Sequence, residues 1–433
     1  MNVAIVGFGI EGQAAYAHWS QLGADITICD QDPYKQIPPD AASQLGDNYL
    51  EGLDRFDLIF RTNGLNPDVL LRDNPGIGDK VTTSLNEFMR VAPTKHIIGV
   101  TGTKGKGTTS TLITKMLEAA GKEVFLGGNI GVSLLTVLPK LTADSWVVAE
   151  LSSYQLVDFR YSPPIAVCLM VVPEHLNWHG DMESYILAKA RLFEHQTTED
   201  LAIYYANNDT SRRIASYGQG RKLPYFAEPG AYVKDGSIVI SGERICDTDE
   251  LKLLGEHNWQ NACAAVTAVW QVTQNMQAIR SVLTTFAGLP HRLESIRSVN
   301  GVTYFNDSFA STPDAAIASL EAIREPKVII LGGFDRKLPL DHLARALADN
   351  HDAIRKAVII GASGVRLAGE LEKAGFTNYV IEQARDMPAI VKTAQSYTRQ
   401  GDAVLLSPGF ASFDMFKNFE DRGNQFRTVV EKL

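Results

Sequence analysis

A glycine-rich segment near residue 100 contains the residue types and spacing best suited to chemistry. Residues 96–109 read as an apolar strand, a turn with Gly102 and Gly105, and then a helix. Such a turn points backbone N–H groups into one concavity, which with the helix N-terminus forms a seat for phosphate. Lys106 would reach the β- and γ-phosphates, and a threonine hydroxyl after it would bind Mg²⁺. The segment predicts binding of a nucleoside triphosphate.

This segment departs from the usual phosphate loop in two places. The first glycine is displaced to Gly99 or Gly102, and Gly107 separates the lysine from Thr108 and Thr109, either of which could supply the hydroxyl. A glycine-rich turn with an unrelated lysine is the plainer alternative, which the strand and helix on either side make less favourable.

A second glycine motif stands at the start of the chain. Gly7, Gly9 and Gly12 follow a short apolar strand, and the next strand ends in Asp30. The spacing and context fit the fingerprint of a dinucleotide-binding fold. Taken alone, the motif favours an NAD-dependent oxidoreductase. Because the glycines allow close approach of the backbone to any pyrophosphate, it indicates a Rossmann-like domain more strongly than it indicates NAD.

Polar residues also follow the buried strands of the middle part. Glu150 ends one apolar strand, His175 follows another, and Lys189 lies on an amphipathic helix. A divalent metal bound to nucleotide needs acidic oxygen ligands such as Glu150. Singly, such residues are more often a helix cap or ion pair, a structural histidine and a solvated lysine.

The elements that must position these residues form three α/β segments in sequence. Strands without polar alternation alternate with helices, which predicts mostly parallel sheets. We expect a Rossmann-like domain over residues 1–91, a central phosphate-loop ATPase-type domain over 92–290, and a C-terminal Rossmann-like α/β domain over 291–433. The middle part becomes richer in β-structure over residues 201–245, and an alanine-rich helix follows over 258–272.

Composition sets broad limits on the function. The 433 residues exceed the size of one core, and 45% hydrophobic with 21% charged residues is ordinary for a globular protein. A net charge of −9 argues against general nucleic-acid binding. The four cysteines form no CxxC pair and are expected to be buried and reduced. Without a visible signal peptide or membrane-spanning run, a cytoplasmic protein is expected.

Several short motifs, in order, resemble those of the Mur ligases, ATP-dependent amide ligases of peptidoglycan precursor synthesis. The resemblance runs nearly end to end. It rests on residues 102–106 (GTKGK), 128–131 (GNIG), 150–155 (ELSSYQ), 174–175 (EH), 188–191 (AKAR), 256–261 (EHNWQN), 289–294 (LPHRLE), 306–308 (NDS) and 406–414 (LSPGFASFD) with 416–419 (FKNF).

The resemblance is closest to the branch that adds D-glutamate to UDP-N-acetylmuramoyl-L-alanine, and it implies these two substrates. It implies ATP, two Mg²⁺ ions, an acyl-phosphate intermediate and a monomer. The net charge and the lack of a long apolar run lead us to expect no nucleic-acid or membrane partner. It also implies that CO₂ carbamylates Lys189, which then becomes a metal ligand with Thr108, Glu150 and His175. The catalytic set would be Lys106, Lys189, His175, Glu150 and Arg292.

The resemblance assigns the remaining site residues by matching motifs. Nucleotide contacts would come from Gly102, Thr103, Lys104, Gly105, Lys106, Gly107, Thr108, Thr109, Asn258, Asn261, Arg292 and Asp307. The UDP-linked substrate would contact Gly9, Ile10, Asp30, Gly64, Asn129 and Ser152. The amino acid would contact Ser311, Lys337, Ser412 and Phe419.

The amino-acid site departs from the D-glutamate pattern. Phe309 stands where that branch has a lysine that helps to hold the glutamate side chain, and losing such a contact costs about 1.5–3 kcal/mol if nothing compensates. Residues 312–314 (TPD) resemble Mur-type and folylpolyglutamate-synthase-like ligases for other amino acids. Since Lys337, Ser412 and Phe419 match the D-glutamate pattern, D-glutamate is favoured and a different amino acid stays open.

Two alternatives lie outside ligation. An NAD-dependent oxidoreductase would leave the segment around Lys106 unexplained. A non-catalytic protein that binds a UDP-sugar or nucleotide would be expected to have lost Lys106, Glu150, His175 or Lys189, and all four are present. The enzyme interpretation is therefore preferred.

Overall fold

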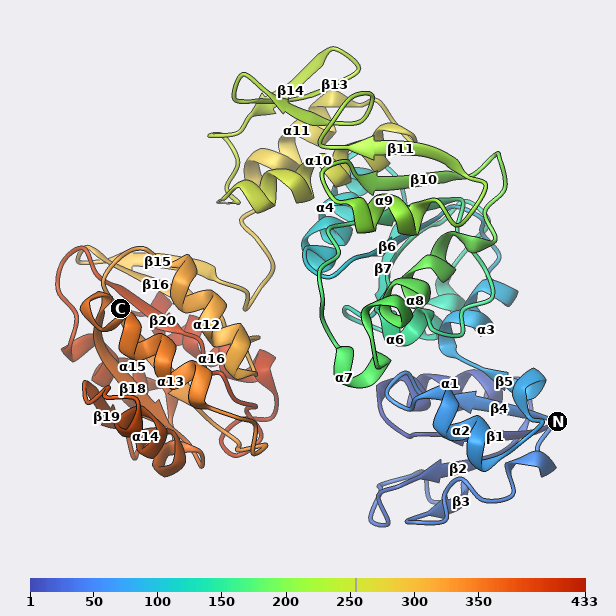
Figure 1. Cartoon of the computed structure of the whole chain (residues 1–433), viewed down its shortest axis with the longest axis horizontal. Coiled ribbons are helices and arrows are strands. Elements are labelled where there is room, and N and C mark those ends of the chain that lie inside the picture. The colour runs from blue at the N-terminus through green and yellow to red at the C-terminus, as the bar shows by residue number, and fades with distance from the viewer. Residues whose placement is uncertain (254) are drawn as a thin grey trace. The chain divides into compact units, whose positions relative to one another are not determined.

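The computed structural model describes residues 1–253 and 255–433. The chain forms two compact units, the N-terminal unit Met1–Phe286 and the C-terminal unit Ala287–Leu433 (Figure 1). Both are α/β, and each has its own hydrophobic core. The expectation of an α/β chain with mostly parallel sheets is confirmed.

The N-terminal unit begins with a five-stranded parallel sheet in the order β3-β2-β1-β4-β5. The central strand β1 is fully buried beyond its first residue, which fits its apolar sequence. The strands are β1 (Asn2–Val6), β2 (Asp25–Asp30), β3 (Ala42–Leu45), β4 (Leu58–Arg61) and β5 (Val81–Thr82), and the α-helices are α1 (Ile10–Gln21), α2 (Pro67–Asp73) and α3 (Ser84–Val91).

A second sheet of the same unit has six parallel strands in the order β11-β10-β9-β6-β8-β7. Its strands are β6 (Ile97–Thr101), β7 (Val124–Gly128), β8 (Trp146–Glu150), β9 (Ile165–Cys168), β10 (Leu201–Tyr205) and β11 (Arg221–Tyr225). Its α-helices are α4 (Lys106–Ala119), α5 (Leu134–Val137), α6 (Ser153–Leu156), α7 (Leu176–His179), α8 (Met182–Glu194) and α9 (Asp209–Ala215).

The apolar run over residues 165–172 forms a shorter strand than its sequence predicts. Strand β9 ends at Cys168, and the chain beyond it bonds to the last residue of β6 and to the glycine-rich loop that follows. Leu169 donates its N–H to the carbonyl oxygen of Thr101 at 2.8 Å, and Met170 accepts from the N–H of Thr103 at 2.8 Å. The second half of the run therefore lies beside a loop, with Leu169 and Val171 buried and Val172 exposed.

The predicted β-rich stretch is confirmed as β10 and β11 followed by a small antiparallel sheet. That sheet has the order β12-β13-β14, with β12 (Tyr232–Lys234), β13 (Ser237–Ile240) and β14 (Glu243–Asp247). The alanine-rich helix α10 (Glu256–Trp270) follows, and then α11 (Met276–Thr285), both packed against α4.

The C-terminal unit is built on a six-stranded sheet in the order β15-β16-β20-β17-β18-β19. Only β15, at one edge, is antiparallel to its neighbour. The strands are β15 (Glu294–Val299), β16 (Val302–Asn306), β17 (Lys327–Gly332), β18 (Ile354–Ile360), β19 (Tyr379–Ile381) and β20 (Ala403–Leu406). The α-helices are α12 (Pro313–Ala322), α13 (Asp341–Asp349), α14 (Gly364–Lys373), α15 (Met387–Ser396) and α16 (Phe419–Glu431).

Two further sequence expectations concern cysteines and membranes. Cys29, Cys168, Cys246 and Cys263 are all free and buried, as expected. Across the described ranges 1–253 and 255–433, no helix combines the length and the apolar character that crossing a membrane requires.

Candidate functional site

The glycine-rich loop between β6 and α4 is shaped by two glycines that no other residue could replace without strain. Gly102 has φ +148° and Gly105 has φ +87°. A Cβ on Gly102 would lie 2.6 Å from Cβ of Leu169, and one on Gly105 would lie 2.1 Å from Oδ1 of Asn261. Lys106 folds its amine over the loop and donates to the carbonyl oxygens of Gly102 and Thr103, both at 3.1 Å. The strand–loop–helix geometry is that of a phosphate-binding site.

Lys189, on α8, lies against the same loop. Its side chain is buried, and its Nζ is 2.9 Å from the carbonyl oxygen of Gly102 and 3.5 Å from Oγ1 of Thr101. Burial, and then the charge of Lys106, lowers the pKa of Lys189 to about 7. A lysine on an amphipathic helix is usually solvated, but Lys189 is buried, so the expectation of a solvated surface lysine is wrong. A substantial fraction of the amine is therefore uncharged at neutral pH, and an uncharged amine is nucleophilic.

Glu150 lies at the end of β8, which pairs directly with β6. Its Oε1 accepts from Nδ2 of Asn129 at 2.7 Å. Its Oε2 is buried and has no hydrogen-bond partner among the described residues. Gly128, with φ +106°, lets the chain approach closely enough for the N–H of Asn129 to donate to the carbonyl oxygen of Glu150 at 2.8 Å. A buried carboxylate oxygen without a partner fits a divalent cation, whose preferred ligands are oxygens.

His175 precedes α7 and adopts a left-handed backbone with φ 58°. Its ring lies 5.0 Å from that of Tyr154, and its Nε2 is 3.7 Å from Oε2 of Glu174. Burial lowers the pKa of His175 although the Glu174 carboxylate opposes this, so the ring is neutral at pH 7 and able to bind a metal.

The predicted metal set contains only two conventional ligand side chains. Among residues 1–253 and 255–433, nowhere do three or more His, Cys, Asp or Glu side chains form a group that could hold a metal. Glu150 and His175 would therefore depend on the half-buried Thr108 and on a modified Lys189 to complete a site.

The two predicted asparagines of α10 lie beside the loop. Asn261 is within 3.5 Å of Oγ1 of Thr109, and its Nδ2 donates to Oδ1 of Asn258 at 3.1 Å. The structure therefore brings together the loop, Lys189 and Asn261, which are distant in the sequence.

Sequence reasoning missed two residues around this loop. His179 contacts Oγ of Ser153 at 2.9 Å, and burial together with the charge of Lys189 lowers the pKa of His179 to about 4. Tyr185 bonds its hydroxyl to Oγ1 of Thr103 at 3.0 Å, and its ring centroid lies 4.6 Å from Nζ of Lys189. Both lie one helical turn from a predicted residue, His175 or Lys189, and that spacing is the signal that could have found them.

The N-terminal glycine motif is well defined in the first sheet. A Cβ on Gly7 would lie 2.4 Å from Cγ2 of Thr62, and one on Gly12 would lie 2.1 Å from the carbonyl oxygen of Gly7. Gly9 has open space around it, and the neighbouring Ile10 is 75% exposed. Gly7 and Gly12 therefore shape the turn, and Gly9 and Ile10 are accessible to a ligand.

Asp30 supports this turn from the next strand. Its carboxylate accepts the N–H of Phe8 at 2.7 Å and that of Asp32 at 3.0 Å, and Lys35 lies 3.5 Å away. Burial raises the pKa of Asp30, but these N–H groups and Lys35 together lower it further, so the carboxylate is ionised at neutral pH. Exposed Gly64 and half-buried Ser152, the latter capping α6, complete the predicted substrate residues of this unit.

In the C-terminal unit, Asp307 is buried and bonded to its own unit. It accepts from the N–H of Leu293 at 3.1 Å, from Oγ of Ser407 at 2.9 Å and from the hydroxyl of Ser319. Burial raises the pKa of Asp307 to about 6 despite these hydrogen bonds. Arg292 lies nearby on the same unit, with its guanidinium carbon 3.8 Å from the ring centroid of Phe309.

The predicted amino-acid residues occupy different environments within this unit. Ser311 lies beside Arg336 in a crevice too narrow to hold a water molecule, whereas Lys337 has an exposed amine paired with Asp335 at 3.0 Å. Ser412 is buried, and the Phe419 ring packs against Phe309 with centroids 5.1 Å apart. Sequence reasoning did not single out Arg336, which directly precedes Lys337.

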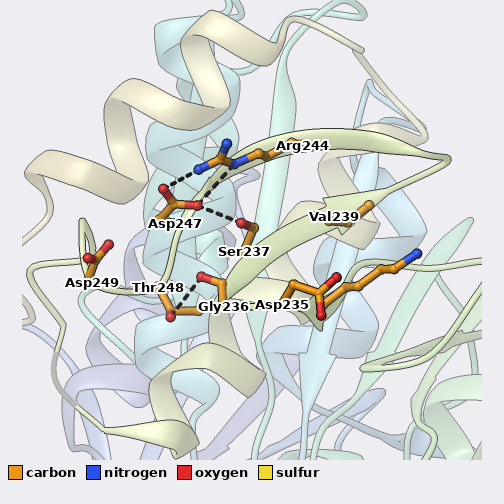
Figure 2. Close-up of a pocket in the computed structure, with 9 residues that line it drawn as sticks. Asp235, Gly236, Ser237, Val239, Arg244, Asp247, Thr248 and Asp249 are labelled. Atoms are coloured by element: carbon orange, nitrogen blue, oxygen red, sulfur yellow. Dashed lines mark hydrogen bonds and ion pairs between the residues drawn. The ribbon is translucent and has the colours of Figure 1, made fainter.

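A larger surface hollow lies elsewhere, on the small antiparallel sheet. The hollow has a volume of about 610 Å³, and Asp247 in its lining accepts from Ser237 Oγ at 2.6 Å. Figure 2 shows this polar lining, in which Asp247 also pairs with Arg244. None of the predicted site residues lines it, so it lies outside the candidate site.

Known proteins are similar to this chain in sequence and in fold. Residues 100–269 match the Mur ligase middle domain, and residues 291–410 match the Mur ligase glutamate ligase domain. The UDP-N-acetylmuramoylalanine--D-glutamate ligase of Clostridium kluyveri is 35% identical, with 100% of this chain and 97% of the relative covered. The enzyme of that name from Acetivibrio thermocellus is 37% identical, with 100% and 96% covered.

Solved structures at lower identity show the fold alone. MurF from Acinetobacter baumannii has a TM-score of 0.60 at 17% identity, covering 94% of this chain and 85% of that one. UDP-N-acetylmuramate-alanine ligase MurC from Thermotoga maritima has a TM-score of 0.59 at 16% identity, covering 100% and 99%. Given the two matched domains and the full-length identity above 30%, the chain belongs to the Mur ligase family.

Proposed function

We propose that this chain is an ATP-dependent ligase that joins D-glutamate to UDP-N-acetylmuramoyl-L-alanine in peptidoglycan precursor synthesis. Full-length similarity to ligases of that name supports the substrate pair. The observation that supports the chemistry most is the buried amine of Lys189, 2.9 Å from a carbonyl oxygen of the phosphate loop. In line with the family resemblance, we expect a cytoplasmic monomer.

The reaction has two steps. The carboxylate of UDP-N-acetylmuramoyl-L-alanine attacks the γ-phosphorus of ATP, which gives an acyl phosphate and releases ADP. The amine of D-glutamate then attacks the acyl carbon, and inorganic phosphate leaves from the tetrahedral intermediate while the amine loses a proton. Because the first step brings a carboxylate to a polyanion, Lys106 and the loop N–H groups serve mainly to offset charge and hold the phosphates.

Lys189 is proposed to act as a carbamate. Its uncharged amine adds to CO₂ with loss of one proton, which replaces a buried base by a buried anion. The carbamate, Glu150, His175 and Thr108 would hold two Mg²⁺, which when bound neutralise phosphate charge. The unpartnered Oε2 of Glu150 and the uncharged ring of His175 support this set.

The remaining roles are assigned from the matched motifs. The loop residues with Asn258 and Asn261 would contact the nucleotide, Arg292 would stabilise phosphate charge, and Asp307 would hold the ribose. The open environment of Gly9 and Ile10 supports contact with the UDP moiety. Asp30, Gly64, Asn129 and Ser152 complete that set.

Amino-acid contacts are proposed for Ser311, Lys337, Ser412 and Phe419. Arg336, exposed beside Ser311, would offer its guanidinium to a carboxylate and so offset the loss of the lysine that Phe309 replaces. We propose three domains: residues 1–91 bind the UDP-linked substrate, residues 92–290 bind ATP, and residues 291–433 bind the amino acid.

The test is phosphate release from ATP with purified protein, Mg²⁺ and UDP-N-acetylmuramoyl-L-alanine, across D-glutamate, L-glutamate, D-isoglutamine, meso-diaminopimelate and L-lysine. Release that requires both D-glutamate and the UDP-sugar is expected. Release with another amino acid would support a Mur-type ligase of different specificity. ATP binding without release for any pair would contradict the proposal and favour a non-catalytic binding protein.

A further inference from the structure

Arg61, the last residue of β4, has a completely buried guanidinium whose hydrogen bonds reach two separate loops. Its Nε and Nη2 donate to the two carboxylate oxygens of Asp158 at 2.9 and 2.8 Å. Its Nη1 donates to the carbonyl oxygens of Thr62 and Leu65 at 3.1 and 2.5 Å. Nη2 also donates to the carbonyl oxygen of Tyr154 at 3.4 Å. The planar guanidinium therefore joins a loop of the first sheet to a turn of the second.

The two segments that Arg61 joins are those proposed above to bind the UDP-linked substrate. The carbonyl groups on one side of the guanidinium bracket Gly64. The groups on the other side belong to helix α6, whose N-terminus Ser152 caps, and to the turn that follows this helix. One buried cation thus fixes the spacing between two loops that come from different sheets.

We propose that Arg61 is a positioning residue for the UDP-linked substrate. By holding the Gly64 loop against the segment after Ser152, it presents both loops in a fixed relation before the substrate arrives. Such preorganisation lowers the cost of ordering loops on binding and is therefore expected to lower KM for that substrate. This inference rests on the proposed function, because Gly64 and Ser152 are assigned to the substrate there.

The partner segment keeps other supports when Arg61 is changed. Nδ2 of Asn86 donates to the carbonyl oxygen of Asp158 at 3.0 Å, and Oδ1 of Asn86 accepts from the N–H of Arg160 at 3.0 Å. A conservative variant at Arg61 should therefore fold while losing the forked contact.

The experiment compares Arg61→Lys, Asp158→Asn and the double variant Arg61→Met/Asp158→Leu, which removes both charges together. The matched control is Arg355→Lys, since Arg355 pairs with the buried Asp402 through Nε at 3.1 and 3.2 Å in the C-terminal unit. KM for each substrate, kcat and Tm are measured, and calorimetry follows binding of UDP-N-acetylmuramoyl-L-alanine.

We expect Arg61→Lys and Asp158→Asn each to raise KM and Kd for the UDP-linked substrate about tenfold, a shift equivalent to about 1.4 kcal/mol. KM for ATP and kcat should stay within about twofold of the parent, and the control should change none of the kinetic values. A lower Tm with unchanged KM and Kd would show a purely structural ion pair and overturn the inference alone. Equal rises in KM for ATP and the UDP-linked substrate would also overturn it. No binding of that substrate by the parent protein would overturn both this inference and the proposed function.

Discussion

The side chain of Lys189 is buried, rather than solvated as expected, because α8 packs it against the glycine-rich loop. In the folded protein its pKa is about 7, against 10.5 for the ordinary side chain. Between these pH values the unfolded chain binds a proton that the folded chain does not. The free energy of unfolding therefore rises with pH across this window, and the buried amine destabilises the fold most at pH 7 and below.

Replacing Lys189 by methionine should separate catalysis from stability. Lys189→Met keeps the volume but removes the amine, and Lys106 still bonds to the carbonyl oxygen of Gly102. We expect ATP-dependent phosphate release to fall at least about 100-fold. The free energy of unfolding at pH 7 should rise by an amount on the order of 1–4 kcal/mol, and the gain should shrink as pH approaches 10.5. Denaturant unfolding of the parent and the variant from pH 7 to 10 measures this difference in the free energy of unfolding. A variant that is less stable than the parent at pH 7 would contradict this account.

Phe309 is predicted to act on Arg292. The guanidinium over its ring forms a cation–π contact worth about 0.5–2 kcal/mol, so Phe309→Leu should lower kcat/KM for ATP about 2- to 30-fold. Phe309→Lys should lower it further, because it places a second cation beside Arg292. Steady-state kinetics with each substrate varied would show this. A change confined to KM for D-glutamate would instead place Phe309 in amino-acid recognition.

At the scale of elements, strands were easier to predict than the segments that come after them. Strands β2 and β8 end at Asp30 and Glu150, as predicted from their apolar sequences. The run over 165–172 forms a strand only as far as Cys168, because Leu169 and Val171 are buried beside a loop and the sequence does not distinguish this from burial in a sheet. Helix α8 was predictable, but the burial of Lys189 was not, since periodicity does not say which polar residue will face another buried segment.

The two ends of α4 offer a matched pair of glycines. Gly105 before the helix and Gly121 after it have φ +87° and +81°, but only Gly105 has an atom near its Cβ position. Gly121→Ala should cost about 1–2 kcal/mol of stability through backbone strain alone and leave KM for ATP unchanged. Gly105→Ala adds the clash with Asn261 and should raise KM for ATP at least about tenfold. Chemical denaturation and ATP titration distinguish the two, and equal effects on ATP would refute the role of the close approach.

At the scale of the molecule, each unit has a core of its own. Buried residues cover both faces of the C-terminal sheet, in one cluster around Leu331 and another around Tyr304. A fragment of residues 287–433 should therefore fold with a cooperative thermal transition followed by circular dichroism. A fragment 287–433 without a cooperative transition would show that this unit depends on the other.

A fragment of residues 1–286 should bind ATP but release no phosphate, because Arg292 and Asp307 lie outside it.

Sequence motifs identified most residues of the candidate site, but they did not show which of these residues lie close together in the fold. The loop after β6, Glu150 and Lys189 were each predicted from local patterns. Their proximity depends on the sheet order, which single-sequence patterns do not specify. Long-range partners such as Arg61 and Asp158, 97 residues apart, leave no local signal at all.

The strand order of the central sheet also sets when the site can be completed during synthesis. Strand β6 is made before both of its neighbours, β8 and β9, and the loop after it bonds to residues beyond β9 and contacts Asn261. A nascent chain that has released β6 alone holds an unpaired apolar strand and an unsupported loop. The nucleotide site is therefore completed only after α10 has emerged from the ribosome, and until the neighbouring strands are made the edge of β6 is open to incorrect pairing.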